Sequence, residues 1–205
     1  MHHVTDMLQR CDYVHCLMID FTKAFDLVNH TILLAKLARL DLPERAVNWI
    51  ISYLTGRSQV LKYDGETSSV GSAAEINTSI VQGSGLGPVL YVVMEGDLCT
   101  LSAMNVFVKY ADDTNLLVPS NLDTELVDEF DNVKAWASRN KMIIHLLKTK
   151  KIVFLSAQPQ TCYLSAPLQQ IERVSNAKLL GITLNENLRF DIRVNHVLKM
   201  CSQRF

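Results

Sequence analysis

Two adjacent carboxylates, Asp112 and Asp113, follow an aromatic residue and an alanine in the tetrad Tyr-Ala-Asp-Asp at 110–113. The apolar runs 106–108 and 116–118 flank this tetrad and are rich in residues that favour strands. We therefore expect a hairpin with both acids at or near its tip. Adjacent carboxylates repel each other unless a cation lies between them, and Mg²⁺ is a hard ion that prefers carboxylate oxygen. The alternative is ordinary turn chemistry, because Asp is also a favoured turn residue.

A third carboxylate, Asp20, ends the continuous apolar run 15–19, which is typical of a buried strand. If this strand neighbours the hairpin, Asp20 meets Asp112 and Asp113 at one edge of the sheet. Two divalent cations about 3.5–4 Å apart could be held there, where they would activate an attacking hydroxyl and stabilise the leaving oxygen of a phosphoryl transfer. The glycine-rich stretch 82–88 provides backbone that a nucleotide can approach closely.

Hydrophobic periodicity predicts the elements that must position these residues. We expect the end of a helix at 5–10 and further helices over 31–40, 43–56, 88–101, 123–140 and 190–205. The helix over 88–101 should be fully buried, and Asp123 should cap the helix that extends to 140. Strands are expected over 15–19, 59–63, 76–81, 142–146, 152–155 and 177–184, with a hairpin signal at Asp64-Gly65. Their order lacks strict βαβ regularity, so we expect an α+β fold with an antiparallel sheet backed by helices.

Composition narrows the class of protein. The chain has 205 residues, of which 48% are hydrophobic, enough for one sizeable core or for one domain and the start of another. No apolar stretch approaches the roughly 20 residues that a bilayer requires, and the five cysteines have no metal-ligand spacing, so reduced structural thiols are expected. Residues 1–138 carry 9 Lys/Arg against 18 Asp/Glu, whereas 139–205 carry 11 against 3. This basic C-terminal third could follow a phosphate backbone or could be a solvated face.

Five stretches resemble, in order, the conserved blocks of a reverse transcriptase palm, most closely that of jockey-like, LINE-type retrotransposons without long terminal repeats. The blocks are 19–26, 82–88, the tetrad 110–113, then Trp136 and Asn140 with 145–150, and finally 179–182, which resembles the primer grip. The resemblance covers nearly the whole chain. It implies a right-hand polymerase palm that performs RNA-directed DNA synthesis, in which a primer 3′-hydroxyl attacks the α-phosphate of a deoxynucleoside triphosphate with two Mg²⁺ ions, for which Mn²⁺ could substitute.

The resemblance also implies roles for particular residues. The catalytic acids and metal ligands would be Asp20, Asp112 and Asp113, with the backbone carbonyl of Phe21 completing the metal shell. Backbone amides of Lys23 and Ala24 would meet the triphosphate, Phe25 would exclude a 2′-hydroxyl from the sugar site, Gln82 and Gly83 would contact the nucleotide and template, and Lys148 would neutralise or protonate the leaving pyrophosphate. Three of these have simpler alternatives: a core aromatic at Phe25, a loop-closing Gln82 and a solvated turn lysine at Lys148.

The sequence departs from the family pattern at several points. Ser-Ile-Val stands at 79–81 where Gly-Val-Pro is usual, and His145 stands where asparagine is usual. We expect the palm over 1–185, with a partial fingers insertion at about 43–81, and the start of a thumb or connection at 186–205. The fingers would be largely missing and the thumb truncated, so low activity is expected of the isolated chain.

The resemblance implies an RNA template, a DNA primer, deoxynucleotides and other parts of a larger retroelement polyprotein as partners. The location expected is intracellular, cytoplasmic or nuclear, without a membrane. One alternative is a non-catalytic nucleic-acid- or protein-binding domain that keeps the fold. Another is a metal-dependent nucleotidyl cyclase on a similar palm, but a primer grip and a basic C-terminal third would serve no purpose in a small-molecule enzyme.

Overall fold

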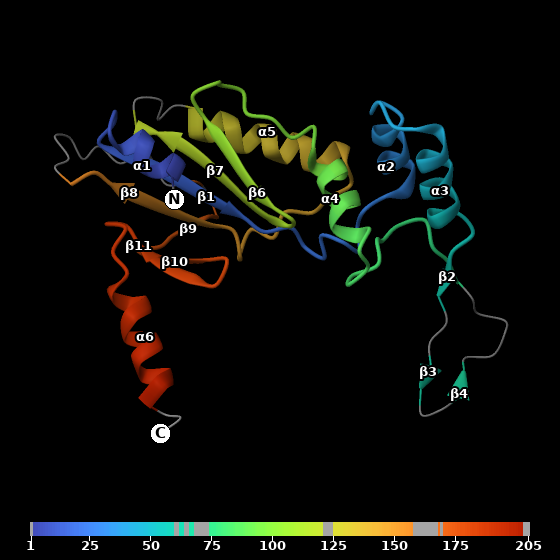
Figure 1. Ribbon diagram of the computed structural model, residues 1–205. Helices are drawn as coiled ribbons and strands as arrows, with labels where there is room; N and C mark the ends of the chain where they lie inside the picture. The colour runs from blue at the N-terminus through green and yellow to red at the C-terminus, as the bar shows by residue number, and fades with distance from the viewer. Residues whose placement is uncertain are drawn as a thin grey trace. The chain divides into compact units, whose positions relative to one another are not determined.

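The structure of the chain is a computed structural model that describes residues 2–59, 62–63, 66–67, 74–120, 125–157, 168 and 170–202. The chain divides into two compact units (Figure 1). The first contains 1–21, 99–136 and 144–205, and the second contains 22–98 and 137–143. Across the described part of the chain, none of the helices has both the length and the hydropathy that crossing a bilayer requires.

The secondary structure follows the chain in this order. The elements before the glycine-rich loop are α1 (His2–Leu8), β1 (Tyr13–Ile19), α2 (His30–Leu37), α3 (Glu44–Leu54), β2 (Ser58–Gln59), β3 (Lys62–Tyr63), β4 (Glu66–Thr67) and β5 (Ala74–Glu75). The elements after it are α4 (Gly87–Glu95), β6 (Val106–Tyr110), β7 (Asp113–Pro119), α5 (Glu125–Arg139), β8 (Lys150–Leu155), β9 (Glu172–Arg173), β10 (Asn176–Leu179), β11 (Ile182–Asn185) and α6 (Asp191–Ser202).

The central sheet of the first unit has the strand order β6-β7-β1-β8-β9 among the described residues (Figure 1). β1 pairs antiparallel with both β7 and β8, so that Leu17 faces Leu116 on one side and Lys151 on the other. This central position explains why the run at 15–19, His15 included, is almost entirely buried, because both faces of β1 are covered. The prediction of an antiparallel sheet is confirmed with one exception, since the short β9 pairs parallel with β8.

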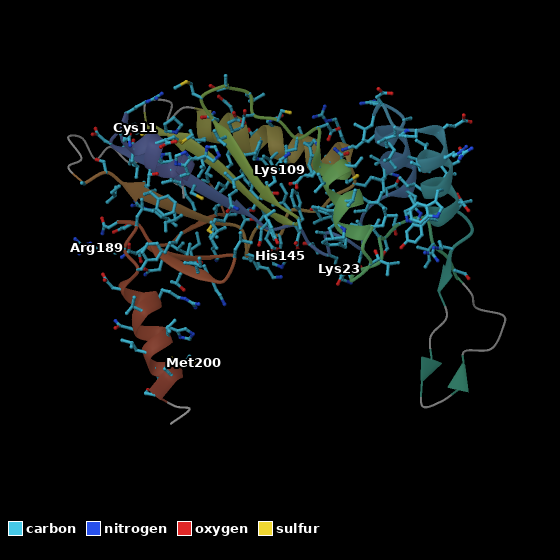
Figure 2. All side chains as sticks on the ribbon, viewed as in Figure 1. Cys11, Lys23, Lys109, His145, Arg189 and Met200 are labelled. Atoms are coloured by element: carbon cyan, nitrogen blue, oxygen red, sulfur yellow. The ribbon has the colours of Figure 1, made fainter. Side chains whose placement is uncertain are left out.

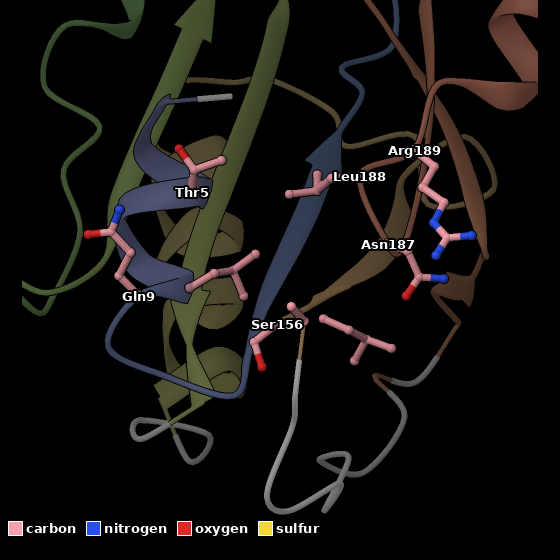
Figure 3. Close-up of a pocket in the computed structure, with 9 residues that line it drawn as sticks. Thr5, Gln9, Ser156, Asn187, Leu188 and Arg189 are labelled. Atoms are coloured by element: carbon pink, nitrogen blue, oxygen red, sulfur yellow. The ribbon is translucent and has the colours of Figure 1, made fainter.

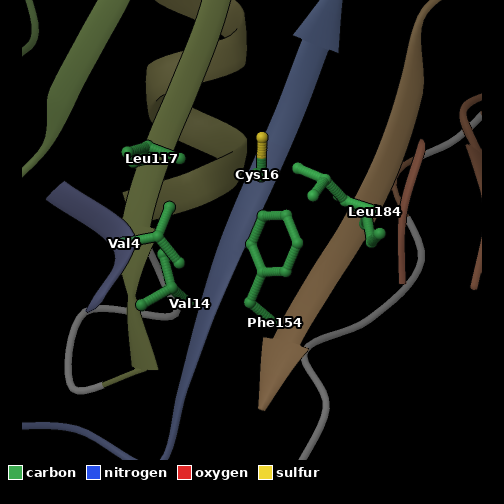
Figure 4. Packing of buried hydrophobic residues seen from close by; sticks show 7 residues of the cluster. Val4, Val14, Cys16, Leu117, Phe154 and Leu184 are labelled. Atoms are coloured by element: carbon green, nitrogen blue, oxygen red, sulfur yellow. The ribbon is translucent and has the colours of Figure 1, made fainter. Parts of the chain in front are cut away.

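Each face of this sheet has its own cover. One face forms a buried cluster in which Val4 of α1 and Leu184 of β11 pack with sheet residues such as Cys16 and Phe154 (Figure 4). Burial raises the pKa of the Cys16 thiol to about 12, which keeps it protonated and unreactive. The opposite face includes Phe21, whose ring lies 5.8 Å from that of Trp136 in α5. Strand alternation therefore places α5 on the face opposite α1.

The second unit is organised by helix contacts. Lys36 of α2 is buried, and its Nζ donates hydrogen bonds to the carbonyl oxygen of Met94 in α4 and, at 2.6 Å, to Oδ1 of Asp97. Burial lowers the pKa of Lys36, while the bond to Asp97 opposes that shift. These hydrogen bonds connect α2 to the C-terminal end of α4. Because α4 begins within the glycine-rich stretch 82–88, the same bonds help to fix the position of that stretch.

Several predicted strands were wrong, and each has a local physical reason. The run 177–184 is a hairpin instead of one strand, because Leu180 and Gly181 both adopt positive φ, +45° and +82°, and reverse the chain between β10 and β11. The run 142–146 contributes a single bridge, Ile144 to Phe21, before the chain turns. The run 76–81 also has a single bridge, and Ser79 interrupts it at φ +86°.

Other boundaries shifted or lie outside the description. α4 ends at Glu95 and not near 101, and it is buried on one side only, since Val89 and Val92 are exposed. α6 confirms the helix predicted after 190 as far as Ser202. The dipeptide Asp64-Gly65 and the cap Asp123 lie outside the described residues, although β3 and β4 pair antiparallel on either side of 64–65.

Candidate active site

The acidic tetrad forms a tight hairpin, as the strand-favouring residues on either side of it predicted. Tyr110 of β6 pairs with Asp113 of β7, which leaves Ala111 and Asp112 as the two turn residues. Ala111 has φ +51°, a left-handed conformation that costs a residue with a Cβ about 1–2 kcal/mol. Asp112 therefore lies at the tip and is exposed, and Asp113 is the first residue of β7, the strand that pairs with β1.

Asp20 lies beside this hairpin. β1 and β7 pair in a register that ends with Ile19 opposite Thr114, and the next residue along β1 is Asp20 while the preceding residue of β7 is Asp113. The pKa of Asp113 is raised, chiefly by burial and then by the negative charges of Asp112 and Asp20. Asp113 therefore lies at this edge of the sheet within reach of the negative charges of both Asp112 and Asp20.

The chemistry of this donor set fits Mg²⁺. Among the described residues, no three His, Cys, Asp or Glu side chains converge as a ready-made metal cage. Mg²⁺ seldom uses such cages, because it keeps several waters and is usually bound by one or two carboxylates together with substrate phosphates. The carboxylates at the exposed ends of β1 and β7 could bind Mg²⁺ in this way, with the phosphates of a nucleotide as the remaining ligands.

Backbone contacts fix the orientation of Asp20. Its N–H donates to Oγ1 of buried Thr149 at 3.2 Å, and its carbonyl oxygen accepts from the N–H of His145 at 2.8 Å. Both backbone groups of Asp20 thus face the segment 145–149. Successive residues of an extended strand turn their backbone groups to opposite sides, so the carbonyl of Phe21 faces the side of β1 on which β7 lies.

Lys148 lies near the same carboxylate. Its Nζ is 3.9 Å from Oδ1 of Asp20, and its side chain remains 65% exposed. Such an exposed ion pair contributes little to stability, at most about 1 kcal/mol. Thr149 contributes more to the position of Asp20, yet no local pattern in the sequence marks it as part of the site.

The substrate-binding residues predicted after Asp20 lie in the second unit. Lys23, visible in Figure 2, has φ +46°, and its carbonyl oxygen accepts from the N–H groups of Asp26 and Leu27. In the described part of the chain, no backbone carbonyl accepts from the amides of Lys23 or Ala24. Phe25 is half-buried, and its ring stacks on that of Tyr91 at 4.9 Å with an interplanar angle of 23°.

The second substrate-binding stretch, Gln82 and Gly83, forms an exposed turn in the same unit, with Gly83 at φ +78°. The hydroxyl of Ser84 closes this turn, because it donates to the carbonyl of Val81 at 2.7 Å and accepts from the N–H of Gly87 at 3.0 Å. A Cβ on Gly87 would lie 2.8 Å from the carbonyl oxygen of Val81, so the closure requires glycine there.

Gly87→Ala should therefore destabilise the chain by about 1–3 kcal/mol, because the clash is with backbone that cannot move aside easily. Gly85→Ala is the matched control, since a Cβ at Gly85 meets nothing within 4 Å. Thermal unfolding of both variants measures the difference. Equal unfolding temperatures would show that the Ser84 closure tolerates a side chain at residue 87.

A separate cavity of about 590 Å³ lies in the first unit between α1, the end of β8 and residues 187–189 (Figure 3). Leu155 lines this cavity and pairs with Tyr13, at the start of β1. The acidic edge begins after Ile19, at the other end of the same strand. The cavity is therefore distinct from the carboxylate site.

Comparisons with known proteins give a consistent result. A family model described as reverse transcriptase (RNA-dependent DNA polymerase) matches residues 2–184. Over 98% of its length the chain is 28% identical to the probable RNA-directed DNA polymerase from transposon BS of Drosophila melanogaster, and over 94% it is 28% identical to the RNA-directed DNA polymerase from mobile element jockey of that fly. The chain spans 23% and 22% of these relatives, less than a quarter of their length.

A solved structure supports the fold. A structure of telomerase from Candida tropicalis, in complex with a fragment of telomeric RNA, resembles 93% of the chain with a TM-score of 0.63, at 10% sequence identity and over 32% of the telomerase chain. This likeness confirms the α+β polymerase-palm fold that the order of elements and the resemblance predicted.

Proposed function

This chain belongs to the reverse transcriptase (RNA-dependent DNA polymerase) family, and we propose that it forms the catalytic palm of a polymerase that copies RNA into DNA for a retrotransposon without long terminal repeats. The observation that supports this most directly is the pairing of β1 with β7, which brings Asp20 to the strand position beside Asp113 and the exposed tip at Asp112. Proteins named RNA-directed DNA polymerases match the chain over nearly its whole length.

In this proposal Asp20 and Asp112 hold Mg²⁺, with Asp113 and the carbonyl of Phe21 in support; Mn²⁺ could substitute. The bound ion supplies Lewis-acid stabilisation of phosphoryl oxygens and lowers the pKa of the attacking hydroxyl. The chain's own contribution is position, because Thr149 and His145 hold the backbone N–H and carbonyl of Asp20. Mutual repulsion of the carboxylates also favours cation binding over an empty acidic edge.

The remaining roles concern the substrate. The amides of Lys23 and Ala24 would donate to the triphosphate, which the absence of a backbone acceptor for them in the described chain supports. Gln82 and Gly83 would contact the incoming nucleotide and template. Lys148, the cation near Asp20, would offset the charge of the leaving pyrophosphate or protonate it.

We further propose the boundaries and partners that the resemblance implies: a palm over 1–185 with a fingers insertion near 43–81, a thumb or connection from 186, an RNA template, a DNA primer and deoxynucleotides. Other parts of a larger retroelement polyprotein would add contacts to nucleic acid, in an intracellular location. The near-neutral charge of −1 supports weak binding by this chain alone.

The experiment is primer extension by the full 205-residue chain on an RNA template annealed to a DNA primer. We expect slow extension that requires Mg²⁺, and primer–template binding that weakens steeply as salt rises, because phosphate contacts release counterions. Robust processive synthesis would contradict the low-activity part of the proposal. Tight binding without any extension in Mg²⁺ or Mn²⁺ would instead favour a non-catalytic domain.

A further inference from the structure

An aromatic and cationic stack lies on the exposed side of α3, at residues to which no role is given above. The rings of Trp49 and Tyr53, one helical turn apart, stack with centroids 5.9 Å apart and an interplanar angle of 24°. The guanidinium carbon of Arg57 lies 4.4 Å from the centroid of the Tyr53 ring. We call these three residues the α3 stack.

The α3 stack is not part of the core. The buried positions of α3 are Ile50 and Leu54, whereas Trp49 is 58% exposed. Arg57 reaches Tyr53 because Gly56, at φ +65°, ends the helix and turns the chain back. So exposed an indole contributes little free energy to folding, because most of its apolar surface stays in water. The neighbouring ring already restricts its motion, which lowers the entropy that binding a partner would cost.

We propose that the α3 stack is a stacking platform for unpaired bases of the template RNA. The inference rests on the proposed function, which supplies a single-stranded template. Proteins bind unpaired strands by stacking bases on aromatic rings and on arginine planes beside the phosphate backbone, largely without sequence preference. The α3 stack presents both an aromatic surface and an arginine plane at one place.

The setting of the α3 stack favours nucleic acid over a dry protein interface. The neighbouring side chains Asn48, Ser52 and Thr55 are exposed and polar, and the positive charge of Arg57 complements phosphate. A tightly packed protein interface would bury those polar groups, at a cost for each one left without a partner. Contact with RNA is wet and polar, so the same groups can keep water or reach a sugar or phosphate oxygen.

Intrinsic fluorescence provides a direct test, because the chain has two tryptophans and the other, Trp136, is only 3% exposed. We titrate the full chain with oligo(U) RNA about 12 nucleotides long, a typical length for such sites, with correction for absorption by the RNA. The tryptophan emission of the wild type should be quenched as RNA binds. In Trp49→Phe, whose remaining tryptophan is buried, the quenching should disappear while the unfolding temperature is unchanged.

Affinity for a labelled oligo(U) completes the test. Trp49→Ala should weaken binding about ten-fold, within the range measured when a stacked aromatic is removed. Arg57→Lys keeps the charge but loses the plane, so it should weaken binding also. Ile51→Ala, a substitution on the same helix at a residue that is 39% exposed and has no ring, should not change affinity.

The outcomes separate this inference from the proposed function. RNA binding without quenching, or with equal affinity for Trp49→Ala, overturns the platform and leaves the polymerase proposal standing. Quenching together with no primer extension supports the platform and counts against the polymerase. Self-association of the chain that Trp49→Ala abolishes, with no quenching by RNA, overturns the platform in favour of a protein interface.

Discussion

Asp112→Asn is expected to lower the rate of Mg²⁺-dependent primer extension about 10³-fold or more, while the unfolding temperature stays level or rises. The amide keeps the size of the carboxylate but removes the charge that would hold the cation, and a loss of several kcal/mol of transition-state stabilisation corresponds to that factor. Single-turnover extension by the full chain measures the rate, since it does not depend on processivity.

The expected rise in stability comes from Asp113. Its pKa is raised in the folded chain by burial, by Asp112 and by Asp20, so the folded state binds more protons than the unfolded state between the two pKa values. The free energy of unfolding therefore falls as pH rises through that window, and the folded chain keeps this loss of stability at neutral pH. Asp112→Asn removes one source of the shift and should flatten the pH dependence of the unfolding temperature.

Mg²⁺ should act on the same repulsion. Adding Mg²⁺ at neutral pH is expected to raise the unfolding temperature of the wild type more than that of Asp112→Asn, because a cation bound to the folded state stabilises it. Asp128→Asn, at an exposed position on α5 in the same unit, is the control for loss of one negative charge. Full activity in Asp112→Asn, or an equal Mg²⁺ response in both variants, would contradict the assignment.

The acids proposed as catalytic could be found from sequence because their surroundings are local. The hairpin around Asp112 could be predicted from the strand-favouring residues on either side of the tetrad, and Asp20 ends the kind of apolar run that a central strand requires. Neither inference needed a contact between distant residues. Their meeting at one edge depended on the condition that the two strands are neighbours, and the antiparallel pairing of β1 with β7 meets that condition.

What could not be predicted depends on contacts far apart in the chain. The hydroxyl of Thr149 accepts from the N–H of Asp20 across 129 residues, and Tyr91 of α4 contacts Phe25 in the turn before α2. No local pattern encodes such pairs. The error over 177–184 has a different source: its turn places Leu180 at positive φ, which sequence preference alone disfavours, so one continuous strand was the simpler interpretation.

The stacking of Phe25 on Tyr91 sharpens the last prediction. Tyr91 is fully buried, and it supports one face of a ring that is itself half-buried. If Phe25 has the role that the resemblance implies, this supported ring would exclude a 2′-hydroxyl, since steric exclusion needs a rigid side chain. Phe25→Val should raise the ratio of ribo- to deoxynucleotide incorporation about 10-fold or more, in the range that single pocket contacts provide.

The same substitution must also cost stability, about 2–4 kcal/mol, because it removes the stacked ring and leaves a cavity beside Tyr91. Stability and discrimination therefore have to be measured together, by thermal unfolding and by incorporation of each nucleotide in single-turnover reactions. Phe25→Tyr, which keeps the ring, should retain both. If Phe25→Val lowers the unfolding temperature and slows both nucleotides alike with an unchanged ratio, Phe25 is a core aromatic, and selection against the 2′-hydroxyl lies with another residue.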